Sequence, residues 1–236
     1  MPIDGRGRSR GSLLGPKSGA GAPTKLAPVP PPKPPTPDES DSLFQTFRRQ
    51  LAPREGGLAN RPVSQDPGGK TFKGITSRDL PSFRKANPDL KLPPDVTKLT
   101  DPQIDAVLRR EFFDRPRVAK VAALPGVGKS APQLPEQLFD AAVLHGAGNA
   151  GKLLQESLDD VLGGSLRITD PNGKKVYDGV VGSKTRDKIA EAARRGLIKE
   201  VNNRMVVRRV AFMRRLPHMT SNPEWISRAR SFRIGP

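Results

Sequence analysis

The sequence predicts a mainly α-helical fold of the α+β class, in which a helical bundle carries a small β-hairpin element behind a disordered or extended proline-rich N-terminus. Apolar residues recur at helical spacing in several segments between residues 42 and 215, and one short segment alternates around a turn signal. Gly, Pro and basic residues dominate the first 41 residues. The 236 residues, of which 34% are hydrophobic, allow one or two domains.

Residues 1–41 are predicted to form a low-complexity linker or anchor. Prolines are dense between residues 23 and 37, where they favour extended polyproline II structure and cannot donate regular backbone hydrogen bonds. The segment has too little apolar surface to offset the entropy that ordering costs. Two interpretations stay open, a semi-rigid spacer and an anchor that becomes ordered in a groove of a larger assembly.

The first helix is predicted over residues 42–54. Residues 38–42 offer N-cap side chains, and one helical face collects Leu43, Phe44, Phe47 and Leu51. Two glycines end this helix just after Glu55, and Pro53 is unfavourable in its last turn. The next 20 residues are rich in turns and are predicted to hold a small β-hairpin around residues 67–69.

Caps, periodicity and turns predict the later elements. Residues 100–103 (Thr-Asp-Pro-Gln) form a capping box that starts a helix reaching Phe112, whose inward positions are apolar apart from Glu111. Further helices are predicted from Pro135 and over 149–162, 183–195 and 198–215, with a hairpin around a Pro-Asn-Gly turn over 166–177.

The formal net charge of +17 predicts attraction to polyanions. Nucleic acid and the anionic polymers of a bacterial envelope both fit this charge, and solubility alone is the alternative. Aromatic residues make up only 5% of the chain, and the basic residues are spread along it. Stacking platforms for bases are therefore scarce, which argues against nucleic acid as the partner.

Residue types exclude several kinds of site. The absence of cysteine excludes disulfides, thiol catalysis and Cys-ligated zinc. His145 and His218 lie far apart without neighbouring ligands, so we expect no metal, no cofactor and no serine triad. No apolar run approaches the roughly 20 residues of a membrane span. The first eight residues have no apolar region behind them and do not resemble a signal peptide.

Residues 123–130 (Ala-Leu-Pro-Gly-Val-Gly-Lys-Ser) fit a loose phosphate-loop pattern, with residues 118–122 as a possible preceding strand. A phosphate loop must run directly into a helix. Pro132 and Pro135 disrupt that helix, so we expect a flexible loop here rather than a nucleotide site.

Residues 55–76 carry the strongest functional signal. Glu55 at a helix end is followed by a glycine-rich turn, Asp66, Thr71 and a Gly-Ile-Thr run. This order suits a glycosidase, which pairs a carboxylic acid with a group that handles water. The segment resembles the signature of glycoside hydrolase family 108, the phage and bacterial muramidases, with the pattern E-G-G-Y-x-N-D-P-x-D-x-G-G-x-T-x-x-G-I-T. One extra residue precedes Asp66, and Leu58 and Arg61 depart from the pattern.

The resemblance continues downstream. Residues 134–143 are similar to the family's L-P-x-x-L-F-D-x-A-V run, and residues 154–185 to its C-terminal peptidoglycan-binding-type module. Residues 222–228 are similar to the closing G-W-x-x-R segment, with Glu224 in place of glycine. The resemblance implies a lysozyme-like catalytic region over 42–130 and a helical peptidoglycan-binding-like module over 131–236 packed on it.

The resemblance also implies catalytic roles. Glu55 would be the general acid, because the glycosidic oxygen leaves poorly without a proton and partial burial raises the pKa of such a carboxyl. Asp66 or Thr71 would position the nucleophile. The alternatives are a turn residue for Asp66 and an ordinary strand residue for Thr71.

The candidate substrate-binding residues are Asn60, Gly69, Thr76, Gln155 and Trp225. Gly69 belongs to a set of glycines that we expect to shape the cleft without touching the sugar. Trp225 either stacks on sugar or fills the core, and the core is the favoured alternative. For Gln155 and its neighbour Asp178, a structural contact is the alternative.

The first functional hypothesis is a muramidase that cleaves the β-1,4 bond between N-acetylmuramic acid and N-acetylglucosamine in peptidoglycan. The N-terminus and the lack of cysteine and signal peptide suggest a lysin carried in a phage virion. Residues 1–41 would hold it to tail or internal proteins, and it would act in the host periplasm during DNA entry. An endolysin and a bacterial secretion-linked muramidase are variants of this hypothesis.

The second hypothesis is a structural virion protein that keeps the lysozyme fold and wall binding but little catalysis. The presence of Glu55, Asp66 and Thr71 argues against it. A third hypothesis, a basic nucleic-acid-binding protein, lacks a recognisable binding motif.

Overall fold

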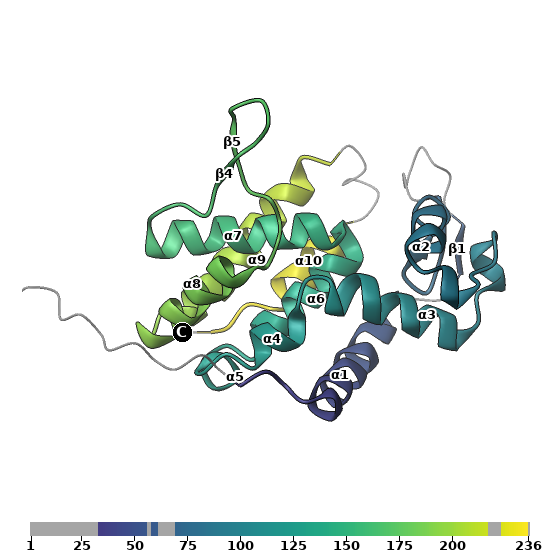
Figure 1. Ribbon diagram of the computed structural model, residues 1–236, viewed down its shortest axis with the longest axis horizontal. Coiled ribbons are helices and arrows are strands. Elements are labelled where there is room, and N and C mark those ends of the chain that lie inside the picture. The colour runs from purple at the N-terminus through teal and green to yellow at the C-terminus, as the bar shows by residue number, and fades with distance from the viewer. Residues whose placement is uncertain (1–32, 56–57, 61–68, 217–222, 236) are drawn as a thin grey trace, which may run out of the picture. The chain divides into compact units, whose positions relative to one another are not determined.

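The structure, a computed structural model, describes residues 33–55, 58–60, 69–216 and 223–235, with the side chains of 54, 55 and 58–60 left out (Figure 1). Its α-helices are α1 (Pro37–Glu55), α2 (Leu80–Ala86), α3 (Asp101–Val107), α4 (Val118–Ala122), α5 (Val127–Ser130), α6 (Gln133–His145), α7 (Ala147–Leu162), α8 (Ser183–Arg194), α9 (Ile198–Arg214) and α10 (Glu224–Arg230). Its strands are β1 (Leu58–Asn60), β2 (Lys70–Phe72), β3 (Ile75–Thr76), β4 (Ile168–Thr169) and β5 (Lys175–Val176). The predicted mainly α-helical fold is confirmed.

Helix α1 begins one turn earlier than predicted, because a capping box precedes it. The backbone N–H of Glu39 donates to Thr36 Oγ1 (3.2 Å), and the Glu39 carboxylate accepts from the Thr36 backbone N–H (2.8 Å). Pro37 fits the first turn, where its missing N–H costs nothing. The cap predicted at residues 38–42 is wrong, because these residues lie inside the helix. The helix runs through Pro53 to Glu55, as far as the acid of the motif.

A three-stranded antiparallel sheet follows α1, in the order β1-β2-β3. The predicted hairpin is present as the β1–β2 pair, and its connection at 61–68 lies outside the described residues. Strands β2 and β3 are joined by the two residues Lys73 (φ 48°) and Gly74 (φ 86°). Positive φ at both positions gives the tight turn whose twist matches antiparallel strands.

Helix α3 starts at the predicted capping box, with both reciprocal hydrogen bonds between Thr100 and Gln103 present. Beyond Val107 it continues as a π-helical segment, η3 (Leu108–Asp114), instead of the single α-helix that the sequence predicted. In η3 the side chains of Leu108, Phe112 and Phe113 are buried, and so is that of Glu111.

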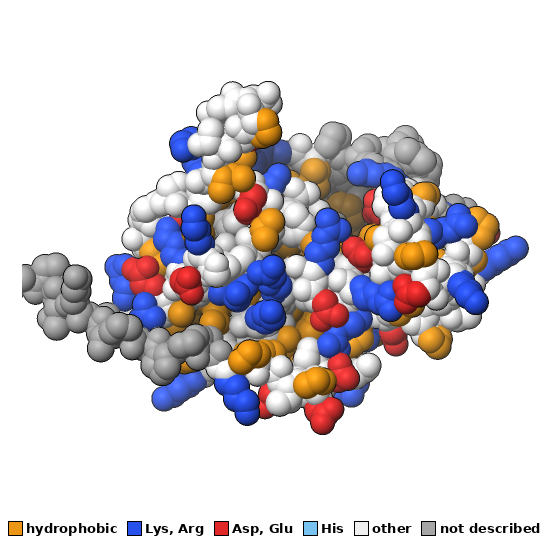
Figure 2. Space-filling view, viewed as in Figure 1, with side chains coloured by type: hydrophobic (Ala, Val, Ile, Leu, Met, Phe, Trp, Pro, Cys, Tyr) orange, Lys and Arg blue, Asp and Glu red, His pale blue; other side chains and the backbone are white. Residues whose placement is uncertain are grey.

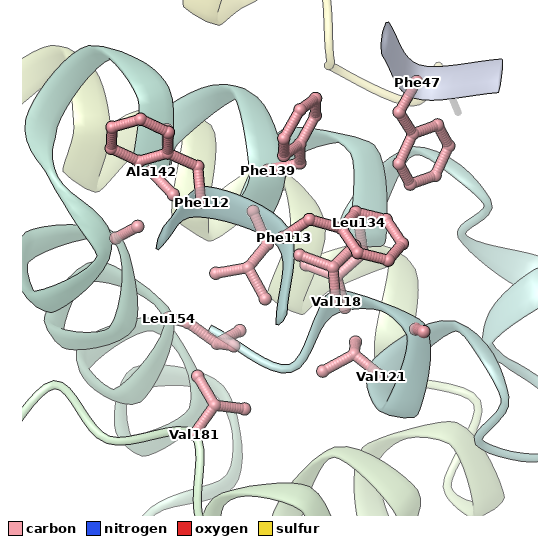
Figure 3. Close-up of a cluster of buried hydrophobic side chains, with 14 of the residues drawn as sticks. Phe47, Phe112, Phe113, Val118, Val121, Leu134, Phe139, Ala142, Leu154 and Val181 are labelled. Carbon is pink, nitrogen blue, oxygen red and sulfur yellow. The ribbon is translucent and has the colours of Figure 1, made fainter. Parts of the chain in front are cut away.

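One hydrophobic core runs through both halves of the folded part of the chain. In it, Phe113 of η3 lies 5.4 Å from Phe44 of α1 and 5.8 Å from Phe139 of α6 between ring centroids. Figure 3 shows Phe113 and Phe139 in one cluster with Leu154 of α7. Residues 32–236 form one compact unit. The boundary predicted at residue 130 therefore stays a prediction that rests on the resemblance.

Two expectations for residues 118–130 are wrong. Residues 118–122 are helix α4 rather than a strand, and residues 127–130 are helix α5 rather than part of a flexible loop. Val118, Val121 and Val127 are fully buried, which anchors both short helices on the core. Gly126 (φ 85°) precedes α5 with a backbone that side chains rarely adopt.

The later helices and the second hairpin are present where the sequence predicted them, within about two residues. In the hairpin β4–β5, the turn is closed by the backbone N–H of Gly173, which donates to Asp170 O (2.9 Å). Figure 1 shows this hairpin projecting from the helices. Among the described helices, none is long and apolar enough to cross a membrane.

Glycines let the loop before α8 lie directly on α7. A Cβ at Gly151 of α7 would overlap the carbonyl oxygen of Gly179. We expect Gly151→Ala to lower the free energy of unfolding by about 1–3 kcal/mol, the usual cost of overpacking. Gly148→Ala is the matched control three residues earlier in the same helix, since its Cβ would meet nothing within 4 Å. Urea denaturation of both variants measures the difference, and equal midpoints would contradict this packing.

Candidate active site

A cleft of about 540 Å³ opens between the small sheet with α2 on one side and the ends of α6, α7, α9 and α10 on the other. Its wall combines arginine, carboxylate and amide side chains with apolar and aromatic ones, the usual character of a ligand site. The lining residues are Gly74, Thr76, Arg78, Asp79, Ser82, Phe83, Glu111, Phe112, Arg115, Val143, Leu144, His145, Gly146, Ala147, Asn149, Phe212, Leu216 and Trp225.

The sheet presents one polar face and one apolar face. Thr71 of β2 pairs with Thr76 of β3, and Phe72 pairs with Ile75. Directly paired residues point to the same side of a sheet and alternate along each strand. Ile75 is fully buried in the core, so Phe72 and Ile75 form the core face. Thr71 therefore shares a face with Thr76, which lines the cleft.

The candidate catalytic residues Glu55, Asp66 and Thr71 lie between the end of α1 and strand β2. Glu55 is the last residue of α1, three residues before β1 begins, and its side chain is not described. Asp66 lies outside the described residues. Thr71 lies in β2, opposite Ala59 of β1, and its hydroxyl donates to Gly69 O (3.3 Å).

The candidate substrate-binding residues are spread over different environments. Asn60 ends β1 opposite Lys70, with its side chain outside the description. Gly69 has φ 66° just before β2, a conformation that favours glycine. Thr76 lies at the cleft, where its hydroxyl donates to Asp79 Oδ2 (2.8 Å) and accepts from the Asp79 backbone N–H (3.1 Å). These two bonds fix the segment that leads from β3 into α2.

Gln155 is buried between α7 and the loop before α8 and is not among the residues that line the cleft. Its side-chain amide donates to Asp178 Oδ1 (2.7 Å) and to Val180 O (3.1 Å), while its oxygen accepts from the Gly179 N–H (2.9 Å). The structure therefore gives Gln155 and Asp178 a role in holding the loop on α7.

Trp225 of α10 lines the cleft and packs on a second apolar cluster at the same time. That cluster is built on Val210, Met213 and Ala229. The two alternatives for Trp225, sugar contact and core, thus describe two sides of one half-buried ring.

Buried charges hold α10 in this position. Asp140 of α6 forms ion pairs with Arg209 of α9 and, at 2.8 Å, with Arg228 of α10. The side chains of Asp140 and Arg209 are 1% and 0% exposed. Because burying unpaired charge is very costly, these helices are constrained to keep the three side chains together. Arg228 lies one turn beyond Trp225 on α10, so the ion pairs of Arg228 also hold Trp225 in its position at the cleft.

Residues 48–146 match the family model described as Glycosyl hydrolase 108. They form a glycosyl hydrolase 108 domain. The match starts in α1, contains Glu55 and the whole three-stranded sheet, and ends after α6. The family predicted from residues 55–76 is confirmed over this segment, and the match supports a glycoside hydrolase of the lysozyme type.

Among solved structures, the chain is similar to that titled "Structure of Brucella abortus SagA", with 22% sequence identity and a TM-score of 0.57. The match covers 81% of this chain and 92% of that chain. At this identity the likeness concerns the fold, and it extends well beyond the glycosyl hydrolase 108 domain. No curated protein matches the chain.

The cleft belongs only in part to the glycosyl hydrolase 108 domain. The lining residues from Gly74 to Gly146 lie inside the matched segment, whereas Ala147, Asn149, Phe212, Leu216 and Trp225 lie outside it. The C-terminal helices therefore complete the cleft of the glycosyl hydrolase 108 domain. In the described part of the chain, no cluster of three His, Asp or Glu side chains lies together as a metal site would require.

Several residues of the cleft could not be predicted from the sequence. Arg78, Arg115 and Asn149 gave no signal, because charged and amide side chains on helices and loops are most often solvated. Glu111 did give one, as the polar exception on an otherwise apolar helical face.

His145 is held neutral at the end of α6. Arg209 Nε donates to His145 Nε2 (3.3 Å), which requires an unprotonated acceptor. Burial, together with the positive charge of Arg209, lowers the pKa of His145 from 6.5 to about 3. The ring therefore serves as a hydrogen-bond acceptor in the wall rather than as an acid near neutral pH.

This shift predicts a pH dependence of stability. Between pH 6.5 and about 3 the unfolded imidazole is protonated and the folded one is not. The free energy of unfolding should therefore fall as the pH drops below 6.5, by at most about 1.4 kcal/mol per pH unit from this group. In His145→Gln that contribution is absent. Urea denaturation of both proteins at pH 7 and pH 5 measures it, and equal losses in both would contradict the neutral ring.

Proposed function

We propose that the chain is a muramidase that hydrolyses the β-1,4 bond between N-acetylmuramic acid and N-acetylglucosamine in peptidoglycan. The glycosyl hydrolase 108 match supports a peptidoglycan hydrolase, and it contains the acid, glycine and threonine residues of the motif at 55–76. The observation that carries the proposal is the order of elements: α1 ends at Glu55, and the sheet that follows turns its threonine face to the cleft.

In this mechanism Glu55 is the general acid. The leaving sugar oxygen needs a proton as the glycosidic bond breaks, and a glutamic acid supplies it. A position at the C-terminal end of α1 favours the protonated form, since the partial negative charge of the helix end disfavours a carboxylate.

The second group handles the nucleophile on the opposite face of the sugar. Thr71 is one candidate, because its hydroxyl donates to Gly69 O and so keeps lone pairs that can accept a hydrogen bond from water. Asp66 is the other candidate, and the motif supports it. If Asp66 is the essential base, Asp66→Asn loses most activity while Thr71→Val keeps it, and the reverse result assigns the role to Thr71.

Glu55→Gln should abolish release of muropeptides with reducing muramic-acid ends from purified Gram-negative peptidoglycan, because the amide cannot donate the proton. The measurement is chromatography of the soluble products after borohydride reduction. Glu39→Gln is the matched control at the other end of α1, since glutamine also completes a capping box. Wild-type-like release by Glu55→Gln would refute this role. Wall pelleting without release by either protein would favour a structural wall-binding protein.

We further propose that the enzyme is carried in a phage virion and acts in the host periplasm during DNA entry. The proline-rich, basic residues 1–41 would bind other virion proteins, and the compact folded unit begins only at Pro32. Figure 2 shows Lys and Arg side chains spread over the visible face among acidic ones, which fits contact with an anionic envelope better than a single nucleic-acid groove.

The virion proposal predicts that the protein copurifies with gradient-purified particles and that deletion of residues 1–31 prevents this incorporation. The deletion should leave muropeptide release by the purified enzyme unchanged, because the proposed catalytic residues and the described lining of the cleft all lie after residue 54. Quantitative mass spectrometry of the particles measures incorporation. Particles without the protein, together with activity in the late lysate, would instead assign it to endolysin release.

A further inference from the structure

The π-helical segment η3 brings a carboxylate into the cleft that the proposed mechanism does not use. Glu111 lines the cleft beside Phe112, although the residue is only 8% exposed. π-Helical turns are rare, and those that do occur lie frequently at functional sites. Here the wider turn begins at Leu108 and ends at Asp114, and Glu111 is at its centre.

Glu111 is held in place from two sides. Asn87 Nδ2 donates to Oε1 (2.9 Å), and Arg115 Nη1 donates to Oε2 (3.2 Å). Asn87 is itself fixed, because the same amide donates to Phe83 O (3.1 Å) and its oxygen accepts from Arg110 (3.3 Å). The carboxylate therefore has a defined orientation before any ligand arrives.

These partners do not account for the burial of the carboxylate. The Arg115 side chain is 70% exposed, and an exposed ion pair four residues apart on a helix contributes little. Asn87 is neutral. The charge of Arg110 also acts on Glu111, but the Arg110 side chain is 43% exposed and pairs with Asp89. A buried carboxylate ordinarily needs stronger compensation than one neutral amide and two partly solvated arginines. Two hydrogen bonds also leave about half of the lone pairs of the carboxylate for other donors.

We propose that Glu111 is a substrate-binding carboxylate that accepts a hydrogen bond from a hydroxyl or acetamido N–H of an amino sugar in the cleft. This inference rests on the proposed function. Phe112, Phe212 and Trp225 line the same cleft and supply apolar surface for the face of a pyranose ring. The pairing of one oriented acceptor with aromatic side chains is what such a sugar requires.

The chain provides its own reporter for this cleft, because Trp225 is its single tryptophan and lines the cleft. The experiment titrates chitotetraose into the full-length protein and follows tryptophan fluorescence, in a Glu55→Gln background so that no sugar is cleaved. We expect saturable binding that Glu111→Gln weakens about tenfold or more, the effect of losing a hydrogen bond to a charged group. Glu191→Gln is the matched control, since Glu191 also pairs with an arginine four residues on, at the surface of α8.

A second variant guards against misfolding. Glu111→Asp keeps the charge but withdraws the carboxylate by one methylene, so it should weaken binding while thermal unfolding stays within a few degrees of wild type. In the active background, Glu111→Gln should raise KM with kcat retained and leave the pH profile of kcat in place. Binding by both variants equal to that of the Glu191→Gln control would overturn the proposal.

The two proposals fail in different ways. If wild-type protein releases no muropeptides but chitotetraose binding still depends on Glu111, the muramidase function fails and the sugar site stands. If wild-type protein cleaves peptidoglycan and the Glu111 variants bind and cleave as it does, the function stands and the role of Glu111 is refuted. A collapse of kcat in Glu111→Gln without a change in binding would also refute the binding role and would instead indicate that Glu111 transfers a proton.

Discussion

The buried carboxylate of Asp140 is the constraint on which the C-terminal half of the molecule depends. Arg209 of α9 and Arg228 of α10 both pair with it, so compensation of its charge brings α6, α9 and α10 together. Removing one partner of such a cluster typically costs about 3–5 kcal/mol, because it leaves a charge buried without compensation. An apolar interface can tolerate small shifts, whereas this one must keep the carboxylate and both guanidinium groups in contact.

The ion-pair cluster of Asp140, Arg209 and Arg228 also positions one wall of the cleft. This wall is made by His145 at the end of α6, Phe212 near the end of α9 and Trp225 at the start of α10. Arg209 contacts Asp140 and also donates to His145. Arg209 therefore both holds the helices together and keeps His145 of the cleft wall unprotonated. The ion pair between Asp140 and Arg228 thus joins the motif runs at 134–143 and 222–228, which lie far apart in sequence.

Local signals in the sequence were enough for most of the fold. The capping box at Thr100, the Pro-Asn-Gly turn of the second hairpin and the apolar spacing in α7 each depend on neighbours within a few residues. The missed features depend on partners far along the chain. No sequence signal near Leu108 predicts a π-helical turn. The segment with Val118 and Val121 was considered as a strand, but it is a helix whose valines are buried in the core. For the site, residues 55–76 identified the family, but the wall formed by α9 and α10 follows only from tertiary packing.

Asp140 and Glu111 are both buried carboxyl residues, and comparing their partners separates structure from function. Asp140 is matched by two arginines from other helices, which is the compensation that a purely structural charge requires. For Glu111 the ion-pair partner, Arg115, is largely in solvent and the other hydrogen-bond partner, Asn87, is a neutral amide. A site that must release its ligand after each turnover needs an acceptor oriented in this way but not saturated. The difference in partners, rather than burial itself, marks Glu111 as the residue that faces a substrate.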